Sequence, residues 1–593
     1  MDLPVLSRAA RRWRRWRTVE TWYDPDYRLP FANLDRSGME PRRADLALWY
    51  LLEAGAIRLR GLHRPRPISY RKLSRVHGHE YLESLPDADK LAGIYALDPT
   101  DIVVDELLRT LRLACAGTLW AARYALASRR PTLNLLGGFH HARRDGGGGF
   151  CALNDLAVAV ATLRSRGFRG RVAILDLDAH PPDGTADCLA GDGAAWIGSL
   201  SGSDWGPLLP GVDETRLPDG AGDGPYLEAL DALLGRMPAP QLALVLAGGD
   251  VLLGDRLGRL GLSLQGARER DVRVHRALEG VPSVWVPAGG YHPDSWKVLA
   301  GTGLVLAGRP SKRISRRYDP LHARFGAISR ALPPELLRSD SDELSQADVE
   351  PLYRGGREQR FLRYYTAEGA EYALFRFGFI DQVRRLGYRG LRVAVDATGA
   401  GDRLRLFGSF EGTEHLLVEV VAERRRIGDP TFLFVNWLSL RHPRAQFSLA
   451  RPILPGQEVP GLGLAREAGE LLALIAGRLQ LPGVAFRPAY YHVAYAARYR
   501  FRFTDPARQG RFEALVRDLA GMPLCDATCA VAEGRVLLNG ERWAWEPEDM
   551  IFWIAGEAPP RPEEAAAAAR AREASHFTVN PPLGRDVAQG DRK

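Results

Sequence analysis

Four short apolar segments in the first half of the chain each run directly into glycine or aspartate, and this shared ending constrains the fold more than any other feature. The segments TLNLL, RVAIL, LALVLA and SVWVPA lead into Gly137-Gly138, Asp176-Leu177-Asp178, Gly248-Gly249-Asp250 and Gly289-Gly290-Tyr291. Apolar runs that alternate with helical stretches indicate parallel strands with helices on both faces of the sheet. The functional crevice of such a sheet lies beyond the carboxyl ends of its strands. We therefore expect polar groups from four distant segments to meet at one rim.

The segment that follows RVAIL carries a candidate metal site. Asp178 and His180 alternate with Leu177 and Ala179, so on an extended strand both side chains point to one side. Asp250 can supply a third ligand from another strand. Three protein ligands with an open fourth position are typical of a catalytic zinc ion. A single Asp-x-Asp-x-His motif is more often a strand-end cap than a metal site, but four polar strand ends in one domain favour the metal.

Other polar residues at the same rim suit the hydrolysis of an amide. Such a reaction needs a base for the water, an acid for the leaving amine and a donor that holds the oxyanion. His140 and His141 form the only adjacent histidine pair in the chain and are the candidate acid and base. Asp176 and Asp183 are candidate partners that orient these imidazoles. Tyr291 offers a phenol that can donate to the oxyanion.

Longer motifs around these residues resemble the histone deacetylase superfamily, and the class IV deacetylases most. The motifs are GGFHHARRDGGGGFCALNDLA, LDLDAHPPDG, GGDVLLGDRLGRLGLS and AGGY, together with YDPDYRLP, RVHGHEYL and CAGTLWAARYAL. The resemblance covers residues 20–310. It implies a three-layer α/β/α sandwich of the arginase/deacetylase type around an eight-stranded parallel sheet. It also implies a zinc-dependent deacylase that hydrolyses an N-acyl amide by a metal-activated water.

The resemblance, carried over residue by residue, and the residues themselves together give four sets of site residues. The metal ligands, for zinc or for iron(II) in its place, are Asp178, His180 and Asp250. The catalytic residues are His140, His141, Tyr291, Asp176 and Asp183. The residues expected to contact substrate, with the two aromatic rings as walls of an acyl tunnel, are Phe139, Gly149, Phe150, Gly289 and Gly290. The residues that match a structural potassium site of relatives are Asp176, Ser199 and Leu200.

The sequence departs from the family pattern at two places. Pro181-Pro182 stands where relatives often have His-Gly or Gln-Gly, which stiffens the loop after the metal ligands. The family's early His-Pro is replaced around Met39-Glu40-Pro41, so we expect different entrance loops. The resemblance leaves the substrate open between an acyl-lysine, an acyl-polyamine and an N-acyl metabolite.

Two alternatives to a deacylase remain. An arginase-like ureohydrolase would use two manganese ions and additional aspartate ligands, whereas Asp250 is followed by Val251 and Leu252. A non-catalytic acyl-binding or scaffold protein would need no proton shuttle, yet the histidine pair and Tyr291 are intact. The metal stoichiometry would separate the first alternative from the deacylase.

At 593 residues the chain is too long for a single core, and changes in composition mark five regions. They are a basic segment (1–19), the deacetylase-like domain (20–310), an exposed polar linker (311–354), a region of unknown role (355–556) and a low-complexity tail (557–593). The fourth region mixes β-like runs (LRVAVDA, HLLVEVVAE, TFLFVNWLSL, YRFRF) with helices such as residues 464–479, which predicts a second α+β domain. In it DATGAGD predicts a strand-to-turn connection, and LPGQEVPGLGLAREAGELL a loop that leads into a helix. We expect the tail to be disordered or loosely helical.

Composition narrows the compartment and the partners. Five scattered cysteines give no disulfide framework, so a cytoplasmic location is expected. No apolar run approaches the ~18 residues of a membrane helix, and the first residues lack the apolar stretch of a secretory signal. The net charge is +8, and the Arg/Trp cluster at residues 11–17 could contact an anionic surface, although a solvated helix is the simpler interpretation. Because no nucleic-acid-binding motif accompanies the charge, the expected partner is an acylated protein or small amine.

Overall fold

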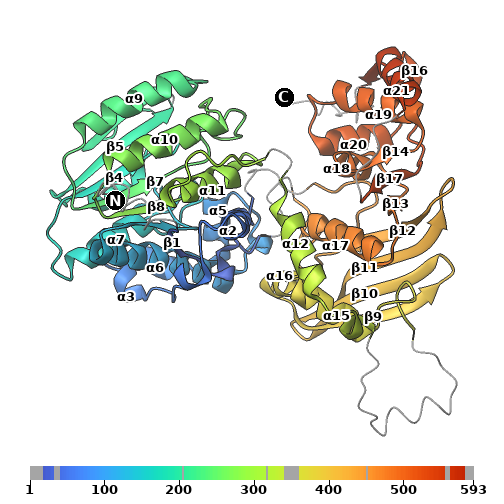
Figure 1. Cartoon of the computed structure of the whole chain (residues 1–593), viewed down its shortest axis with the longest axis horizontal. Helices are drawn as coiled ribbons and strands as arrows, with labels where there is room; N and C mark the ends of the chain where they lie inside the picture. Colours follow the sequence, from blue (N-terminus) through green and yellow to red (C-terminus); the bar gives the residue numbers. More distant parts are fainter. Residues whose placement is uncertain are drawn as a thin grey trace, which may run out of the picture. The chain divides into compact units, whose positions relative to one another are not determined.

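The computed structural model describes residues 18–31, 40–202, 206–315, 318–338, 359–448, 452–554 and 561–580. The chain divides into two compact units, Met1–Arg324 and Phe325–Lys593, and each has a large sheet of its own (Figure 1). The Arg/Trp cluster, Met39 and residues 339–358 lie outside the described residues. None of the helices in the described part is long and apolar enough to cross a membrane.

The first unit is built on an eight-stranded sheet within the described residues. Its strands are β1 (Glu20–Trp22), β2 (Leu62–His63), β3 (Pro131–Asn134), β4 (Val172–Asp176), β5 (Ala195–Gly202), β6 (Val212–Leu217), β7 (Leu242–Leu246) and β8 (Ser283–Val286). The strand order is β2-β1-β3-β8-β7-β4-β5-β6, and every neighbouring pair is parallel. The predicted parallel sheet is therefore confirmed.

Helices cover both faces of this sheet. In Figure 1 α9 (Asp223–Arg236) and α10 (Leu264–Ala277) lie on one face, and α6 (Val104–Ser128) and α7 (Asp155–Arg164) lie on the other. The remaining α-helices of the unit are α2 (Arg43–Glu53), α3 (Tyr70–Leu73), α4 (His79–Ser84), α5 (Ala88–Tyr95), α8 (Asp183–Leu189) and α11 (Ser295–Leu306). All residues of β3, β4, β7 and β8 are buried, as expected for strands with helices on both faces. The expected three-layer sandwich is confirmed.

The strand order explains why the four apolar segments end at one place. They form β3, β8, β7 and β4, which are consecutive neighbours in the middle of the sheet. Because all four strands run parallel, their carboxyl ends lie at the same edge. Residues that are up to about 150 positions apart in the chain, such as His140 and Tyr291, therefore come from adjacent strand ends.

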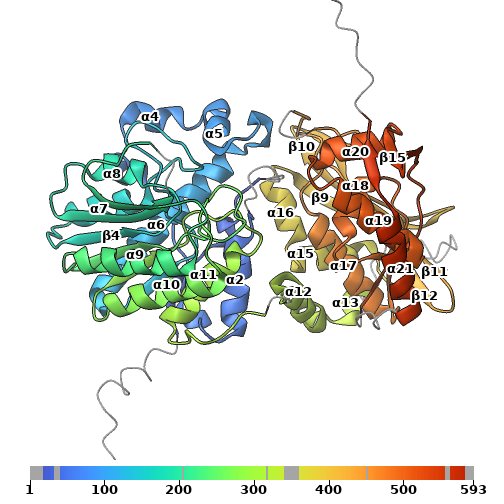
Figure 2. The same ribbon diagram turned by 90° about the horizontal axis from the view of Figure 1, so that it is seen from above.

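The second unit contains a mixed seven-stranded sheet in the order β14-β17-β13-β12-β11-β10-β9. Its strands are β9 (Arg389–Thr398), β10 (Gly401–Phe410), β11 (Thr413–Arg426), β12 (Thr431–Leu440), β13 (Gly483–Phe486), β14 (Arg502–Phe503) and β17 (Met550–Trp553). Its helices are α12 (Pro320–Ala331, which begins before the unit boundary), α13 (Pro334–Arg338), α15 (Ala367–Arg376), α16 (Phe379–Arg385), α17 (Ala465–Arg478), α18 (Tyr491–Ala497), α19 (Pro506–Asp518), α20 (Leu524–Ala532) and α21 (Pro562–Ala574). Figure 2 shows α17 near the centre of this unit. The predicted α+β character is confirmed.

Two details of this sheet are the turn between β9 and β10 and a bulge in β12. The DATGAGD segment is the turn between β9 and β10, as predicted. β12 is antiparallel to β11 along most of its length but pairs with the parallel strand β13 only over residues 433–435. A register shift opposite Val421 and Ala422 places one extra residue, Asn436, in β12 where this pairing stops. Such a bulge bends a strand and ends its pairing.

The structure differs from the expectation at the linker and at the tail. Helices α12 and α13 occupy residues 320–338, within the range expected to be an exposed linker. In the expected tail, α21 packs on α19, where Gly510 lies against the backbone of Ala568. Strand β18 (Phe577–Val579) pairs with β15 (Val536–Leu538), which also pairs with β16 (Glu541–Arg542), and Phe577 is buried. The alanine run of α21 is of low complexity in the sequence. Its small side chains allow α21 and α19 to approach closely.

Candidate metal and catalytic site

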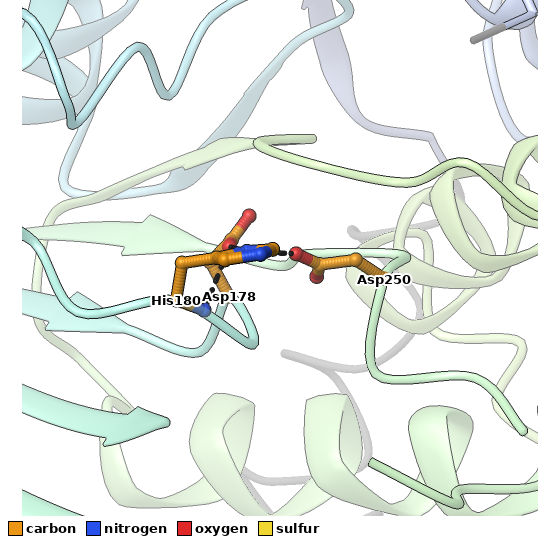
Figure 3. Close-up of side chains that lie close together, drawn as sticks. All are labelled: Asp178, His180 and Asp250. Atoms are coloured by element: carbon orange, nitrogen blue, oxygen red, sulfur yellow. Dashed lines mark hydrogen bonds and ion pairs between the residues drawn. The ribbon is translucent and has the colours of Figure 1, made fainter. Parts of the chain in front are cut away.

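The three candidate metal ligands meet at the carboxyl ends of β4 and β7. Asp178 and His180 follow β4, Asp250 follows β7, and these strands are parallel neighbours. One ligand atom of each side chain lies within 4.8 Å of the other two. His180 Nδ1 is 3.0 Å from Asp178 Oδ1 and 3.0 Å from Asp250 Oδ2, so the imidazole faces both carboxylates (Figure 3). Both aspartates are buried completely.

The surroundings of this group fit a divalent cation. The other carboxylate oxygens are held by backbone amides, because Gly289 N–H donates to Asp178 Oδ2 at 2.6 Å and Ala179 N–H donates to Asp250 Oδ1 at 3.1 Å. The oxygen of Asp178 nearest His180 also accepts from His180 N–H at 3.1 Å, but a carboxylate oxygen has a second lone pair that a metal ion can use. Burial lowers the pKa of His180, but the two carboxylates outweigh burial and raise this pKa to about 11, which means that they attract a positive charge. Two oxygen donors and one imidazole nitrogen are a donor set that zinc accepts.

The adjacent histidines have different partners and different proton affinities. His140 Nδ1 lies 2.9 Å from Asp176 Oδ2, and His141 Nδ1 lies 2.6 Å from Asp183 Oδ1. Burial lowers the pKa of His140, but Asp176 and Asp178 outweigh it and raise this pKa to about 9. Burial and the charge of His140 lower the pKa of His141. The two rings, 4.1 Å apart, are therefore suited to different roles.

Tyr291 lies at the same site and keeps its phenolic proton. Burial and the charges of Asp178 and Asp250 raise its pKa well above the usual value. Its ring lies 5.5 Å from the ring of Phe150, and both residues line one cavity. A neutral phenol beside two carboxylates can donate a hydrogen bond to an oxygen that gains negative charge.

The cavity has a volume of about 570 Å³, and every residue expected to contact the substrate lines it. These residues are Phe139, Gly149, Phe150, Gly289 and Gly290. Part of its wall is Gly146 to Gly149, which carries no side chains. Gly149 has a φ of +52°, and a β-carbon there would lie 2.4 Å from the ring of His141. Glycine is thus needed at this position to leave room for the imidazole.

The residues expected to hold potassium lie beside this cavity. Asp176 and Ser199 are register partners in β4 and β5, and Leu200 follows Ser199 in β5. All three are buried. Ser199 Oγ has no hydrogen-bond partner within the described part of the chain. A buried hydroxyl without a partner is costly, and a cation would satisfy it.

The loop Pro181-Pro182 leads directly into α8, whose first residue is Asp183.

Two residues that the sequence analysis did not single out hold the site together. The half-buried Arg43 in α2 donates from its guanidinium to the carbonyls of Ala288 and Gly289 at 2.5 Å and 2.6 Å. Asp255 accepts from Tyr291 N–H at 2.7 Å and, through its other oxygen, from Leu257 N–H and Gly258 N–H at 3.0 Å. Arg43 gives no signal in the sequence, because it looks like a solvated residue at a helix start. Asp255 lies inside the motif GGDVLLGDRLGRLGLS, where its position could have pointed to a role.

Comparison with known proteins finds matches over the first half of the chain. Residues 37–302 match the model of the histone deacetylase domain. Histone deacetylase 2 of Arabidopsis thaliana is 31% identical over 304 residues, which span 48% of this chain and 77% of that protein. The chain belongs to the histone deacetylase family. An uncharacterized protein of Picosynechococcus is 34% identical over 283 residues, 45% of this chain and 91% of that protein. The crystal structure of an HDAC homolog from Aquifex aeolicus aligns with a TM-score of 0.43 and 23% identity over 52% of this chain and 88% of its own.

The histone deacetylase match ends at residue 302 and so lies within the first unit. The candidate metal group, the histidine pair and Tyr291 all fall inside the matched residues. Residues 37–302 are therefore homologous to amide hydrolases of this family.

Proposed function

We propose that the chain is a zinc-dependent deacylase that hydrolyses an N-acyl amide. The observation that carries this proposal is the single cavity in which Asp178 and His180 lie beside His140, His141 and Tyr291. A divalent metal, when bound, polarises the amide carbonyl and lowers the pKa of water. Iron(II) is the second candidate metal, because the same donors accept it.

The protein groups supply the proton transfers and the orientation. Asp183 holds His141 Nδ1, which leaves Nε2 of this imidazole to exchange a proton with the reacting groups. A neutral His141 serves as the base toward water and then returns the proton to the leaving amine. His140, paired with the buried Asp176, keeps a positive charge near the developing oxyanion. Tyr291 donates its phenolic hydrogen to that oxyanion.

An arginase-like, two-metal reaction has less support. The residues after Asp250 are Val251 and Leu252, both buried and apolar. In the described residues, one group of three or more carboxylate, histidine or cysteine ligands has the spacing of a metal site. A non-catalytic role also has less support, because acyl binding alone does not need two oriented histidines.

The substrate is an acylated amine, and we propose that it carries a long acyl chain. The resemblance of the sequence motifs to class IV deacetylases supports this proposal, as does the wall without side chains from Gly146 to Gly149 next to Phe150. Each methylene buried there contributes ~0.8 kcal/mol. A long chain should therefore raise kcat/KM over acetyl.

One set of assays tests both the metal mechanism and the preference for a long acyl chain. The purified full chain is assayed with acetyl, octanoyl and myristoyl derivatives of a lysine peptide and of a polyamine. We expect hydrolysis of at least one series, about one metal per chain and loss of the rate with a chelator. A chelator-resistant rate would overturn the metal mechanism, and a clear preference for acetyl would overturn the long-chain proposal alone.

A further inference from the structure

A second pocket of about 540 Å³ lies at the β1/β2 edge of the first unit. It shares no lining residue with the cavity that contains His140 and Tyr291. Its walls come from the ends of β1 and β2, from the loop after β2 and from the last third of α6. The proposed hydrolysis uses none of these residues.

The inner wall of this pocket is aromatic. Trp22 and His63 are register partners in β1 and β2, and their rings stack at 4.6 Å with an angle of 25°. Tyr124 of α6 lies 5.7 Å from each of them. Trp120, one turn earlier in α6, is 45% exposed, which is unusual for so large a ring on a packed helix. The pocket thus offers flat surfaces on which a ring could stack.

The rim of the pocket carries three guanidinium groups and no carboxylate among its lining residues. Arg64 is bound to the buried Asp24 at 2.5 Å. Arg66 is exposed and has neither an ion pair nor a hydrogen bond to the residues that the structure describes. Arg123 stacks on Trp120 at 4.5 Å and likewise has no carboxylate partner among them. Two of the three positive charges are therefore available to an anion.

We propose that this pocket binds a phosphorylated compound with a flat ring, of the size of a nucleoside monophosphate. Guanidinium groups match phosphate geometry with paired hydrogen bonds, so Arg66 and Arg123 would take the phosphate. A base can stack against the exposed pair of Trp120 and Arg123, because an aromatic ring and a guanidinium plane both offer a flat face, and the edge of the Arg123 guanidinium still donates to the phosphate. The volume also lies in the range of small-molecule sites. A merely solvated patch would not combine free guanidinium groups with an exposed tryptophan in a concave site.

Calorimetric titration of the full chain with AMP, adenosine and inorganic phosphate tests the proposal. We expect AMP to bind at least about tenfold more tightly than either part, because it uses both the ring and the charge. Arg66→Ala and Arg123→Ala should each weaken AMP binding by about tenfold or more, since a hydrogen bond to a charged group is lost. Trp120→Ala should weaken AMP and adenosine but leave phosphate unchanged.

Arg169→Ala is the matched control, because Arg169 is also an exposed arginine of the first unit but does not line the pocket. Circular dichroism checks that every variant remains folded. Binding of AMP no tighter than phosphate, or equal affinity of the Arg66 and Arg169 variants, would overturn the proposal. So would a single-stranded oligonucleotide that binds far more tightly than AMP, because the ligand would then be a polymer. None of these results depends on the proposed hydrolase activity.

Discussion

Replacing Gly289 with alanine should weaken metal binding although no ligand is changed. A β-carbon at this position would lie 2.6 Å from Asp178 Oδ2 and 2.7 Å from Asp250 Oδ2. Ordinary contact with a β-carbon begins at 3.4 Å, so the two carboxylates must move by about 0.8 Å and 0.7 Å. Gly289 does not have a positive φ, so the backbone accepts alanine and the steric clash is the main effect.

Displacements of this size are large for a metal site. Metal–ligand distances are held to ~0.2 Å, and changes in groups that only orient ligands already cost ~10–100-fold in affinity. We therefore expect Gly289→Ala to lower zinc affinity by ~100-fold or more, which corresponds to ~2.8 kcal/mol. Competition with a chromophoric chelator measures the affinity, and elemental analysis measures the metal content.

Gly146→Ala is the matched control for this experiment. Gly146 lines the same cavity, but a β-carbon there meets nothing within 4 Å. This variant should bind zinc like the unmodified chain. If Gly289→Ala holds zinc as tightly as Gly146→Ala, the two carboxylates are not ligands in the arrangement described here.

Three further predictions concern Tyr291, Asp255 and the independence of the first unit. Tyr291→Phe should lower kcat by ~10²–10³ with unchanged metal content, because one oxyanion donor is lost; full activity would remove Tyr291 from the mechanism. Asp255→Ala should lower kcat with little change in zinc affinity, because Asp255 holds the backbone amide of Tyr291 and no metal ligand. An equal loss of kcat and of zinc affinity would mean that Asp255 stabilises the whole site. A chain that ends at Ala331, the last residue of α12, should fold and bind metal; insoluble protein would show that the first unit depends on the second.

Much of the first unit could be predicted because its signals are local. An apolar strand that ends in Asp-x-Asp-x-His carries its own boundaries, and the structure brings Asp178, His180 and Asp250 together as the motifs indicated. The role of Arg43 could not be predicted, because its partners Ala288 and Gly289 lie about 245 residues away. Only the folded chain shows that its guanidinium is bound to these two carbonyls.

The second unit was predicted only in outline. The runs LRVAVDA and TFLFVNWLSL became β9 and β12, whereas β10 (GDRLRLFGSF) was not singled out, because its charged residues interrupt the apolar pattern. The helix α21 was expected to be loose, since a run of alanines carries no apolar stripe. Its order comes from close contact with Gly510, which no local pattern reveals.

Strand β8 joins two groups of strands that are otherwise separate. Until Ser283–Val286 is in place, β2, β1 and β3 form one group, and β7, β4, β5 and β6 form another. Contacts between segments this far apart in sequence form slowly, and an unpaired strand edge is prone to aggregation. All three candidate metal ligands follow strands of the second group, whereas the histidine pair follows β3 and Tyr291 follows β8. During refolding the chain should therefore acquire a first, weaker affinity for metal before it recovers catalysis, and the full affinity should follow when β8 brings the Gly289 amide to Asp178.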